Sequence, residues 1–279
     1  MMKLEHSILL GAIQGITEWL PISSSAQGIL VMINYLGMSP KSAFHYIGIL
    51  HFGTLLAVIL KFRRDLRSML LGKDNKLLAF LTVSTLASMI SGSVSYFFLE
   101  DFLGHVTKNF VNLFIAVMLF ITALLLYLEG KIKSPQLKEL EDITYVEMLI
   151  VGLAQGFAIL PGISRSGVTI ATLLLLGVRA ETSLKLSFLM SIPVVFGAIF
   201  VISLESSLYS LPIIAVVVGN LASFIFGYLT IDFLLMVSRR MRFDIFCMFF
   251  SLIIFLFFVL DSCYSKDYKL LFVNYIDDG

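Results

Sequence analysis

Hydrophobic stretches follow one another almost without interruption from His6 to Leu260, separated only by short polar loops. A helix needs about 20 apolar residues to cross the hydrocarbon core of a bilayer, so the length of each stretch predicts whether it spans the membrane. Charged residues make up 14% of the chain, against about 25% in a soluble globular domain. A water-soluble fold is therefore excluded. We expect an all-α integral membrane protein forming a single domain, residues 1–279.

The hydrophobic stretches fall into two length classes. Four are too short to cross a membrane and form two adjacent pairs, each split by a Pro- and Ser-rich element that begins at Pro21 or Pro161. Because Pro cannot continue a helix and Ser favours the start of the next, each pair is expected to be a re-entrant pair of half-helices. The pairs lie near 6–20 with 24–36 and near 145–160 with 166–177. Six transmembrane helices are predicted near 42–60, 77–99, 109–128, 183–203, 211–236 and 243–261.

The two halves of the chain form an internal repeat, near residues 6–129 and 145–262. Each half has one broken pair and three spans, and three crossings place the second half on the opposite face, so the sequence predicts an inverted-topology repeat. Lys and Arg collect in the loops that this layout places in the cytoplasm, as expected of short cytoplasmic loops. A shift of 141 positions lays Gly11, Gln14, Gly15, Ile22, Ser23 and Ser25 on Gly152, Gln155, Gly156, Ile163, Ser164 and Ser166.

Glu18 and Arg165 are charged residues at membrane depth. A charge there costs about 2.5 to 3.5 kcal/mol on insertion scales, so both need partners. The breaks are expected to meet near the midplane, where half-helix N-termini and an Arg fork suit a phosphate or pyrophosphate. The structural alternative is an ion pair with serine caps and close-packing glycines. Ser23, Ser24 and Ser25 are expected to cap one half-helix, and Ser164, Arg165, Ser166 and Gly167 to open the other.

Three further polar residues lie within hydrophobic stretches. Gln14 and Gln155 match under the repeat and either contact a ligand or join membrane helices. His51 is either a buried, hydrogen-bonded residue or a proton-transfer group. Cys247 and Cys263 have no metal-type spacing. The net charge of +1 gives no reason to expect nucleic acid as a partner.

The stretch from Gln14 to Ser25 resembles the Glu/Gln-x-x-x-Glu signature of the undecaprenyl pyrophosphate phosphatase family, also called the bacitracin-resistance protein family. Pro161 to Gly167 is similar to its second signature, and the resemblance covers nearly the whole chain. It implies a membrane enzyme that converts polyprenyl pyrophosphate to the monophosphate and phosphate, recycling the lipid carrier for envelope glycans. It also implies a divalent cation, magnesium or calcium, and a site on the extracytoplasmic side of the cytoplasmic membrane.

Carried over by position, the resemblance makes Glu18, Ser24 and Arg165 the catalytic residues. Glu18 either binds metal with Gln14 or accepts a proton, and Ser24 either attacks or orients an attacking water. The expected substrate-binding residues are Gln14, Ser23, Ser25, Gln27, Gly162, Ser164, Ser166 and Gly167.

This sequence departs from the family pattern at Gln27, where many bacterial members have a His with a base or nucleophile role. The departure fits an archaeal branch with a different polyprenol. His51 is then a candidate replacement base. Besides hydrolysis of the lipid pyrophosphate, the alternatives are flipping of polyprenyl phosphate, because inverted repeats also describe transporters, and an inactive lipid-binding relative. The bilayer is an expected partner, and a homodimer a further expectation.

Overall fold

Helices make up the described part of the chain in this computed structural model, which covers residues 4–105, 108–131, 137–203 and 212–240. The span predicted near 243–261 lies outside these residues, as do both cysteines. Five helices are long and apolar enough to cross a membrane, by length and composition. They are α3 (Pro40–Lys61), α5 (Asn75–His105), α6 (Lys108–Lys131), α9 (Ala180–Ser203) and α10 (Ile213–Arg240). These match the other five predicted spans and make the protein a multi-pass membrane protein.

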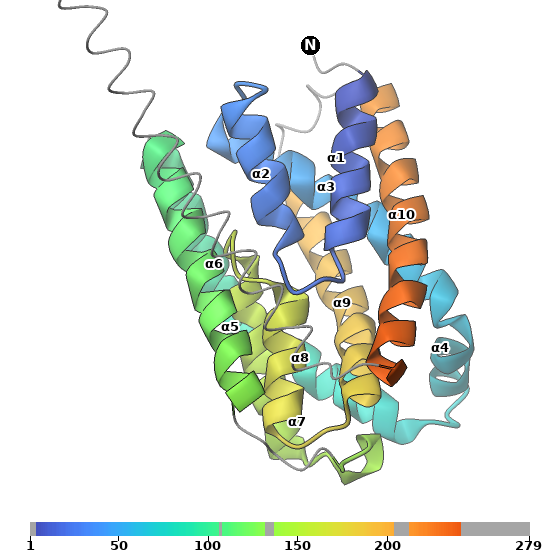
Figure 1. Cartoon of the computed structure of the whole chain (residues 1–279). Coiled ribbons are helices and arrows are strands. Elements are labelled where there is room, and N and C mark those ends of the chain that lie inside the picture. The colour runs from blue at the N-terminus through green and yellow to red at the C-terminus, as the bar shows by residue number, and fades with distance from the viewer. Residues whose placement is uncertain (1–3, 106–107, 132–136, 204–211, 241–279) are drawn as a thin grey trace, which may run out of the picture.

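Four apolar helices are too short to cross a membrane, as predicted, and come in two consecutive pairs. The first pair is α1 (Leu4–Thr17) and α2 (Ser24–Asn34), and the second is α7 (Tyr145–Gly156) and α8 (Arg165–Leu175), with a 3-10 turn η2 (Phe157–Ile159) after α7. Figure 1 shows α1 and α2 in the upper half and α7 and α8 in the lower half, so the turn between α1 and α2 approaches the start of α8 near mid-height. The remaining elements are α4 (Arg63–Leu70) and η1 (Leu140–Asp142).

Glycines allow each pair to pack tightly against a long helix. α1 lies along α10 (Figure 1), and α7 packs against α5. A Cβ atom on Gly15 would lie 2.6 Å from the carbonyl oxygen of Ser223, and one on Gly156 would lie 2.7 Å from that of Ser88. Close approach through small residues is the usual way for helices to associate in membranes. The pairs are therefore fixed in position by glycines that match under the 141-residue shift.

The surface of the long helices carries large apolar side chains. Ile90, Val94 and Phe98 on α5 are 67%, 69% and 58% exposed, respectively. Patches of this kind are rare on soluble monomers and are expected to face lipid. Inside, a buried apolar cluster that contains Trp19, Phe80 and Phe188 surrounds the region where the breaks meet.

Candidate active site

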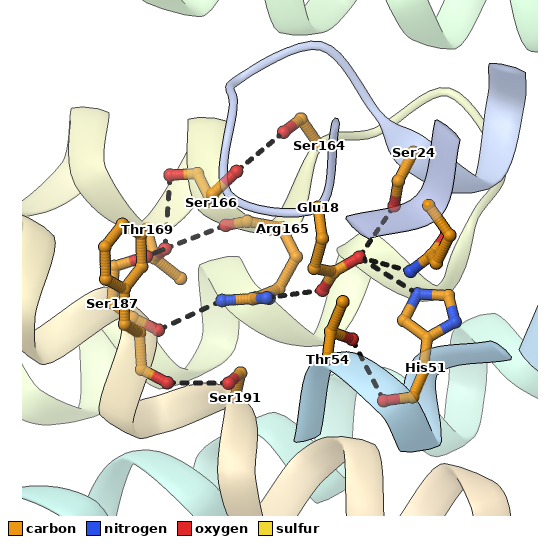
Figure 2. Close-up of polar contacts among 12 residues, drawn as sticks. Glu18, Ser24, His51, Thr54, Ser164, Arg165, Ser166, Thr169, Ser187 and Ser191 are labelled. Carbon is orange, nitrogen blue, oxygen red and sulfur yellow. Dashed lines mark hydrogen bonds and ion pairs between the residues drawn. The ribbon is translucent and has the colours of Figure 1, made fainter. Parts of the chain in front are cut away.

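Glu18 is the centre of a polar cluster inside the helical bundle, and its side chain is only 5% exposed. Its Oε1 atom accepts Nη2 of Arg165 at 2.5 Å. Its Oε2 atom accepts the hydroxyl of Ser24 at 2.7 Å and Nε2 of Gln14 at 2.7 Å. Nε2 of His51 lies 3.3 Å from the same oxygen. Figure 2 shows Arg165 on one side of the carboxylate and Ser24 and His51 on the other. The ion pair between Glu18 and Arg165, which the sequence offered as the structural alternative, is present.

The first break places Ser24 against Glu18 through an unusual backbone turn. Ser23 has φ 56° and ψ 87°, a left-handed conformation that costs about 1 to 3 kcal/mol in a residue other than Gly. Ser23 occupies the N-cap of α2, yet its side chain makes no capping hydrogen bond. The prediction that Ser23 caps α2 with its hydroxyl is therefore wrong. In the observed structure, Ser23 Oγ accepts the backbone N–H of Gly162 at 3.2 Å, because the left-handed turn directs it to the other break.

The serines of the second break form hydrogen bonds within the protein. Ser164 is the N-cap of α8 and accepts the N–H of Gly167 at 3.1 Å, as predicted. Ser166 donates to the carbonyl oxygen of Leu20 at 2.9 Å, which joins the two breaks again. Gly162 has φ 105°, and a Cβ there would lie 2.6 Å from the carbonyl oxygen of Ile115. The N–H groups of Gly162 and Gly167 are thus used within the protein.

Arg165 is held in a fixed orientation by contacts that the sequence did not predict. Its Nη1 atom donates to the carbonyl oxygen of Ser187 at 3.1 Å, and its guanidinium lies 5.2 Å from the ring centre of Trp19. The hydroxyls of Thr169 and Ser187 lie 2.6 Å apart and tie α8 to α9 (Figure 2). Two sequence signals could have identified these residues. Trp19 directly follows Glu18, and Ser187 belongs to a run of serines spaced by four residues in an apolar stretch.

The two ring nitrogens of His51 each face an acceptor. Nδ1 lies 2.8 Å from the carbonyl oxygen of Ile47, which can only accept, so Nδ1 carries a proton. Nε2 faces Glu18 at 3.3 Å. This arrangement suits an imidazolium that donates from both nitrogens, paired with the Glu18 carboxylate.

A cavity of about 580 Å³ opens at this cluster. Its walls are mostly apolar side chains from α3, α5 and α9. Gln14, Gln27, Gly162, Ser166 and Gly167 are not among the lining residues. The structure thus brings most of the predicted site together but leaves these five off the cavity wall, with Gln27 half-buried on α2. The predicted site residues that line the cavity are Glu18, Ser23, Ser24, Ser25, His51, Ser164 and Arg165.

The described residues contain no group of three or more His, Cys, Asp or Glu side chains that could hold a metal ion. Glu18 is the only carboxylate among the described residues that line the cavity. Beside it, the Oε1 atom of Gln14 is buried without a hydrogen-bond partner. Mg²⁺ is commonly bound by one or two carboxylates together with substrate phosphates. The residues therefore fit a cation that binds with a pyrophosphate, and they do not form a complete protein cage.

Residues 7–255 match the family described as bacitracin resistance protein BacA. An undecaprenyl-diphosphatase of Methanothrix thermoacetophila is 42% identical over 87% of this chain and 92% of its own length. An undecaprenyl-diphosphatase of Halothermothrix orenii is 38% identical over 88% and 93%, respectively. One of Haloarcula marismortui is 32% identical over 86% and 92%. The similarity therefore extends far beyond the two short motifs.

Proposed function

This chain belongs to the BacA family of bacitracin resistance proteins, and we propose that it hydrolyses undecaprenyl pyrophosphate to undecaprenyl phosphate and inorganic phosphate. The observation that carries the proposal is the Glu18, Ser24 and Arg165 cluster at the polar end of a cavity with apolar walls. The product is the lipid carrier on which envelope glycans are built.

The cavity suits a lipid pyrophosphate because it has a polar end for the pyrophosphate and apolar walls for the lipid chain. Arg165 presents a planar guanidinium, which can make two parallel hydrogen bonds to phosphate oxygens. Ser25 and Ser164 line the same polar end and supply hydroxyl donors. The apolar side chains of α5 and α9 would contact the polyprenyl chain. Charge neutralisation and alignment dominate phosphoryl transfer, so a fixed Arg beside the nucleophile is the feature required.

Ser24 is the nucleophile in this proposal, and Glu18 is its base. The Ser24 hydroxyl already donates to Glu18 Oε2 at 2.7 Å, which is within reach for proton transfer. Ser24 Oγ forms a bond to the terminal phosphorus, the bond to the bridging oxygen breaks, and undecaprenyl phosphate leaves. The Ser24 proton passes to Glu18. Water then cleaves the phosphoserine, which regenerates Ser24 and releases hydrogen phosphate.

His51 supports Glu18 in this proposal and does not act as the base. Because both of its nitrogens face acceptors, it has no free lone pair with which to take the Ser24 proton. Its Nε2–H orients the carboxylate that receives that proton. His51 thus contacts Glu18 and lines the cavity, whereas Gln27 does not line it.

A divalent cation, magnesium or calcium, is part of the proposal. Glu18 and the free Oε1 atom of Gln14 would hold it. When bound, such an ion neutralises phosphate charge as the P–O bond breaks.

We further propose that residues 1–279 form one domain in the cytoplasmic membrane, with inverted repeats near 6–129 and 145–262 and a site open to the extracytoplasmic side. The opposite halves occupied by the α1–α2 and α7–α8 pairs support this layout. Labelling of single cysteines placed in loops, by a reagent that does not cross membranes, would test the orientation. Cross-linking in vesicles would test the proposed homodimer.

The experiment that tests the activity is phosphate release from the detergent-solubilised protein given undecaprenyl pyrophosphate and Mg²⁺. We expect equal amounts of phosphate and undecaprenyl phosphate. Binding without product would reject hydrolysis. Transport of polyprenyl phosphate has no observation in its favour, because the relatives described above are named as diphosphatases.

A further inference from the structure

Gln155 lines the same cavity as Glu18 and Ser24 and has a buried hydrogen-bond acceptor without a partner. It lies in the last turn of α7, is 1% exposed, and lines the cavity. Its Oε1 atom is buried and has no hydrogen-bond partner. Leaving a buried amide oxygen unsatisfied costs about 1 to 3 kcal/mol. A donor from outside the chain would remove this cost.

The orientation of the Gln155 amide is fixed by Ser88 on α5. The Ser88 hydroxyl has a single proton, which it donates to the carbonyl oxygen of Ser84 at 2.7 Å or of Gly152 at 2.9 Å. In this structure its oxygen accepts the Nε2–H of Gln155, at 2.9 Å. Oε1 is therefore the atom of the amide that has no partner.

The surroundings show that this arrangement is built into the fold. Gly156 sits against Ser88 with no space for a Cβ, which holds α7 and α5 together at this point. The repeat partner Gln14 has the same pattern, because its Nε2 is bound to Glu18 and its Oε1 has no partner. Gln14 bonds a carboxylate, whereas Gln155 bonds the hydroxyl of Ser88 and lines the cavity.

The chemistry of the reaction selects the ligand of this acceptor. Phosphate oxygens without protons and the polyprenyl chain carry no donor, whereas water does. The negative end of the α7 dipole also favours a donor over an anion at this position. Phosphate-transferring enzymes commonly use an uncharged side chain to orient the attacking water.

We propose that the Oε1 atom of Gln155 holds the water that hydrolyses the phosphoserine formed at Ser24. The inference rests on the proposed function and makes Gln155 a water-positioning residue. The water oxygen forms a bond to phosphorus while the bond from phosphorus to Ser24 Oγ breaks. The proton that Glu18 took from Ser24 in the first step returns to Ser24 Oγ, one water proton passes to Glu18 and from there to solvent, and the other stays on the released hydrogen phosphate. Gln155 cannot titrate and takes no proton.

The test is a rapid-quench measurement with undecaprenyl pyrophosphate labelled in its terminal phosphate. In Gln155→Leu, one equivalent of undecaprenyl phosphate per protein should form quickly, with the label retained on the protein. Phosphate release should then slow by about 100-fold, the scale of a misplaced reacting group. Ser91→Ala is the matched control, because Ser91 bonds the carbonyl oxygen of Leu153 at the same helix contact and does not line the cavity. It should behave as wild type.

A Gln155→Leu protein that forms both products at the wild-type rate, or slows both equally without labelled protein, would overturn the inference. Should that variant fail to show a cooperative melting transition, Ser88→Ala provides the same test. It removes the group that orients Gln155, so we expect the same burst with a smaller slowing, and its absence would equally overturn the inference. Failure of the proposed function looks different, because wild-type protein would then release no phosphate at all.

Discussion

The guanidinium of Arg165 lies 2.5 Å from the carboxylate of Glu18, although 147 residues separate them in the chain. Glu18 follows α1 and Arg165 begins α8, so the ion pair joins two different half-helix pairs. Removing one partner of a buried ion pair typically costs about 3 to 5 kcal/mol. The ion pair at the centre of the candidate active site therefore also holds the two half-helix pairs together.

Replacing Arg165 should remove most of the activity. Arg165→Lys keeps the charge but cannot make a planar two-pronged contact, and Arg165→Ala keeps neither. We expect phosphate release to fall by about 10²- to 10³-fold in the lysine variant, comparable to the loss of one transition-state donor, and further in the alanine variant. Steady-state phosphate release at saturating substrate and metal measures this. Near-normal turnover in Arg165→Lys would show that only the charge matters.

Ser24 and Gln27 form a matched pair on α2. Ser24 lines the cavity and bonds Glu18, whereas Gln27 does not line the cavity. We expect Ser24→Ala to lose most turnover, while Gln27→Ala reduces it only modestly. The label retained on quenched wild-type protein should also vanish in Ser24→Ala. If Ser24→Ala stays fully active, a directly attacking water replaces the serine.

His51 should give the reaction a dependence on pH that His51→Gln lacks. The wild-type arrangement needs a proton on Nε2, so activity should fall as the pH rises through the pKa of His51. In His51→Gln, an uncharged amide replaces the imidazolium. The fall in activity with rising pH should then disappear, and turnover should be partly reduced at every pH. The measurement is turnover against pH for both proteins. An unchanged rate and profile would assign His51 to packing.

Trp19 should affect phosphate binding through Arg165. A cation over an aromatic ring is worth about 0.5 to 2 kcal/mol, depending on burial. We expect Trp19→Leu to raise the KM for the lipid pyrophosphate and Trp19→Phe to retain most of the wild-type value. Thermal melting of both variants separates this effect from loss of packing against Phe188. A KM that follows only the melting temperature would indicate a purely structural role.

Ser23 combines a strained backbone with a useful side chain, and two substitutions separate them. Ser23→Ala keeps the left-handed strain and leaves the Gly162 N–H without its acceptor, so it should be the less stable variant. Ser23→Gly loses the same acceptor but relieves the strain, because Gly adopts positive φ freely. In detergent, wild type and Ser23→Gly should each have a higher melting temperature than Ser23→Ala. The reverse order for the two variants would refute the role of strain.

Physical costs explain which features could be predicted. Hydrocarbon thickness fixes helix length, so the five described spans and both half-helix pairs follow from segment lengths. Because a charge within the membrane is costly, Glu18 and Arg165 were each expected to need a partner, and an ion pair between them was one of the two interpretations.

Hydrogen bonds that depend on a single backbone dihedral angle could not be predicted from the sequence. Ser23 was expected to cap α2 because Ser favours that position, yet its left-handed φ directs the hydroxyl to Gly162. The N–H groups of Gly162 and Gly167 were expected to face ligand, yet serines of the two breaks accept them. No local pattern indicates a hydrogen bond between residues 139 positions apart.

The distance in sequence between Glu18 and Arg165 also imposes an order on biogenesis. A ribosome adds about 5 to 20 residues per second, so the 147 residues between them take roughly 7 to 30 s to synthesise. During that interval the first half has Glu18 and His51 but not the guanidinium of Arg165. The contact between Glu18 and Arg165 can therefore form only after the second half-helix pair is made, and a chain that stops early lacks it.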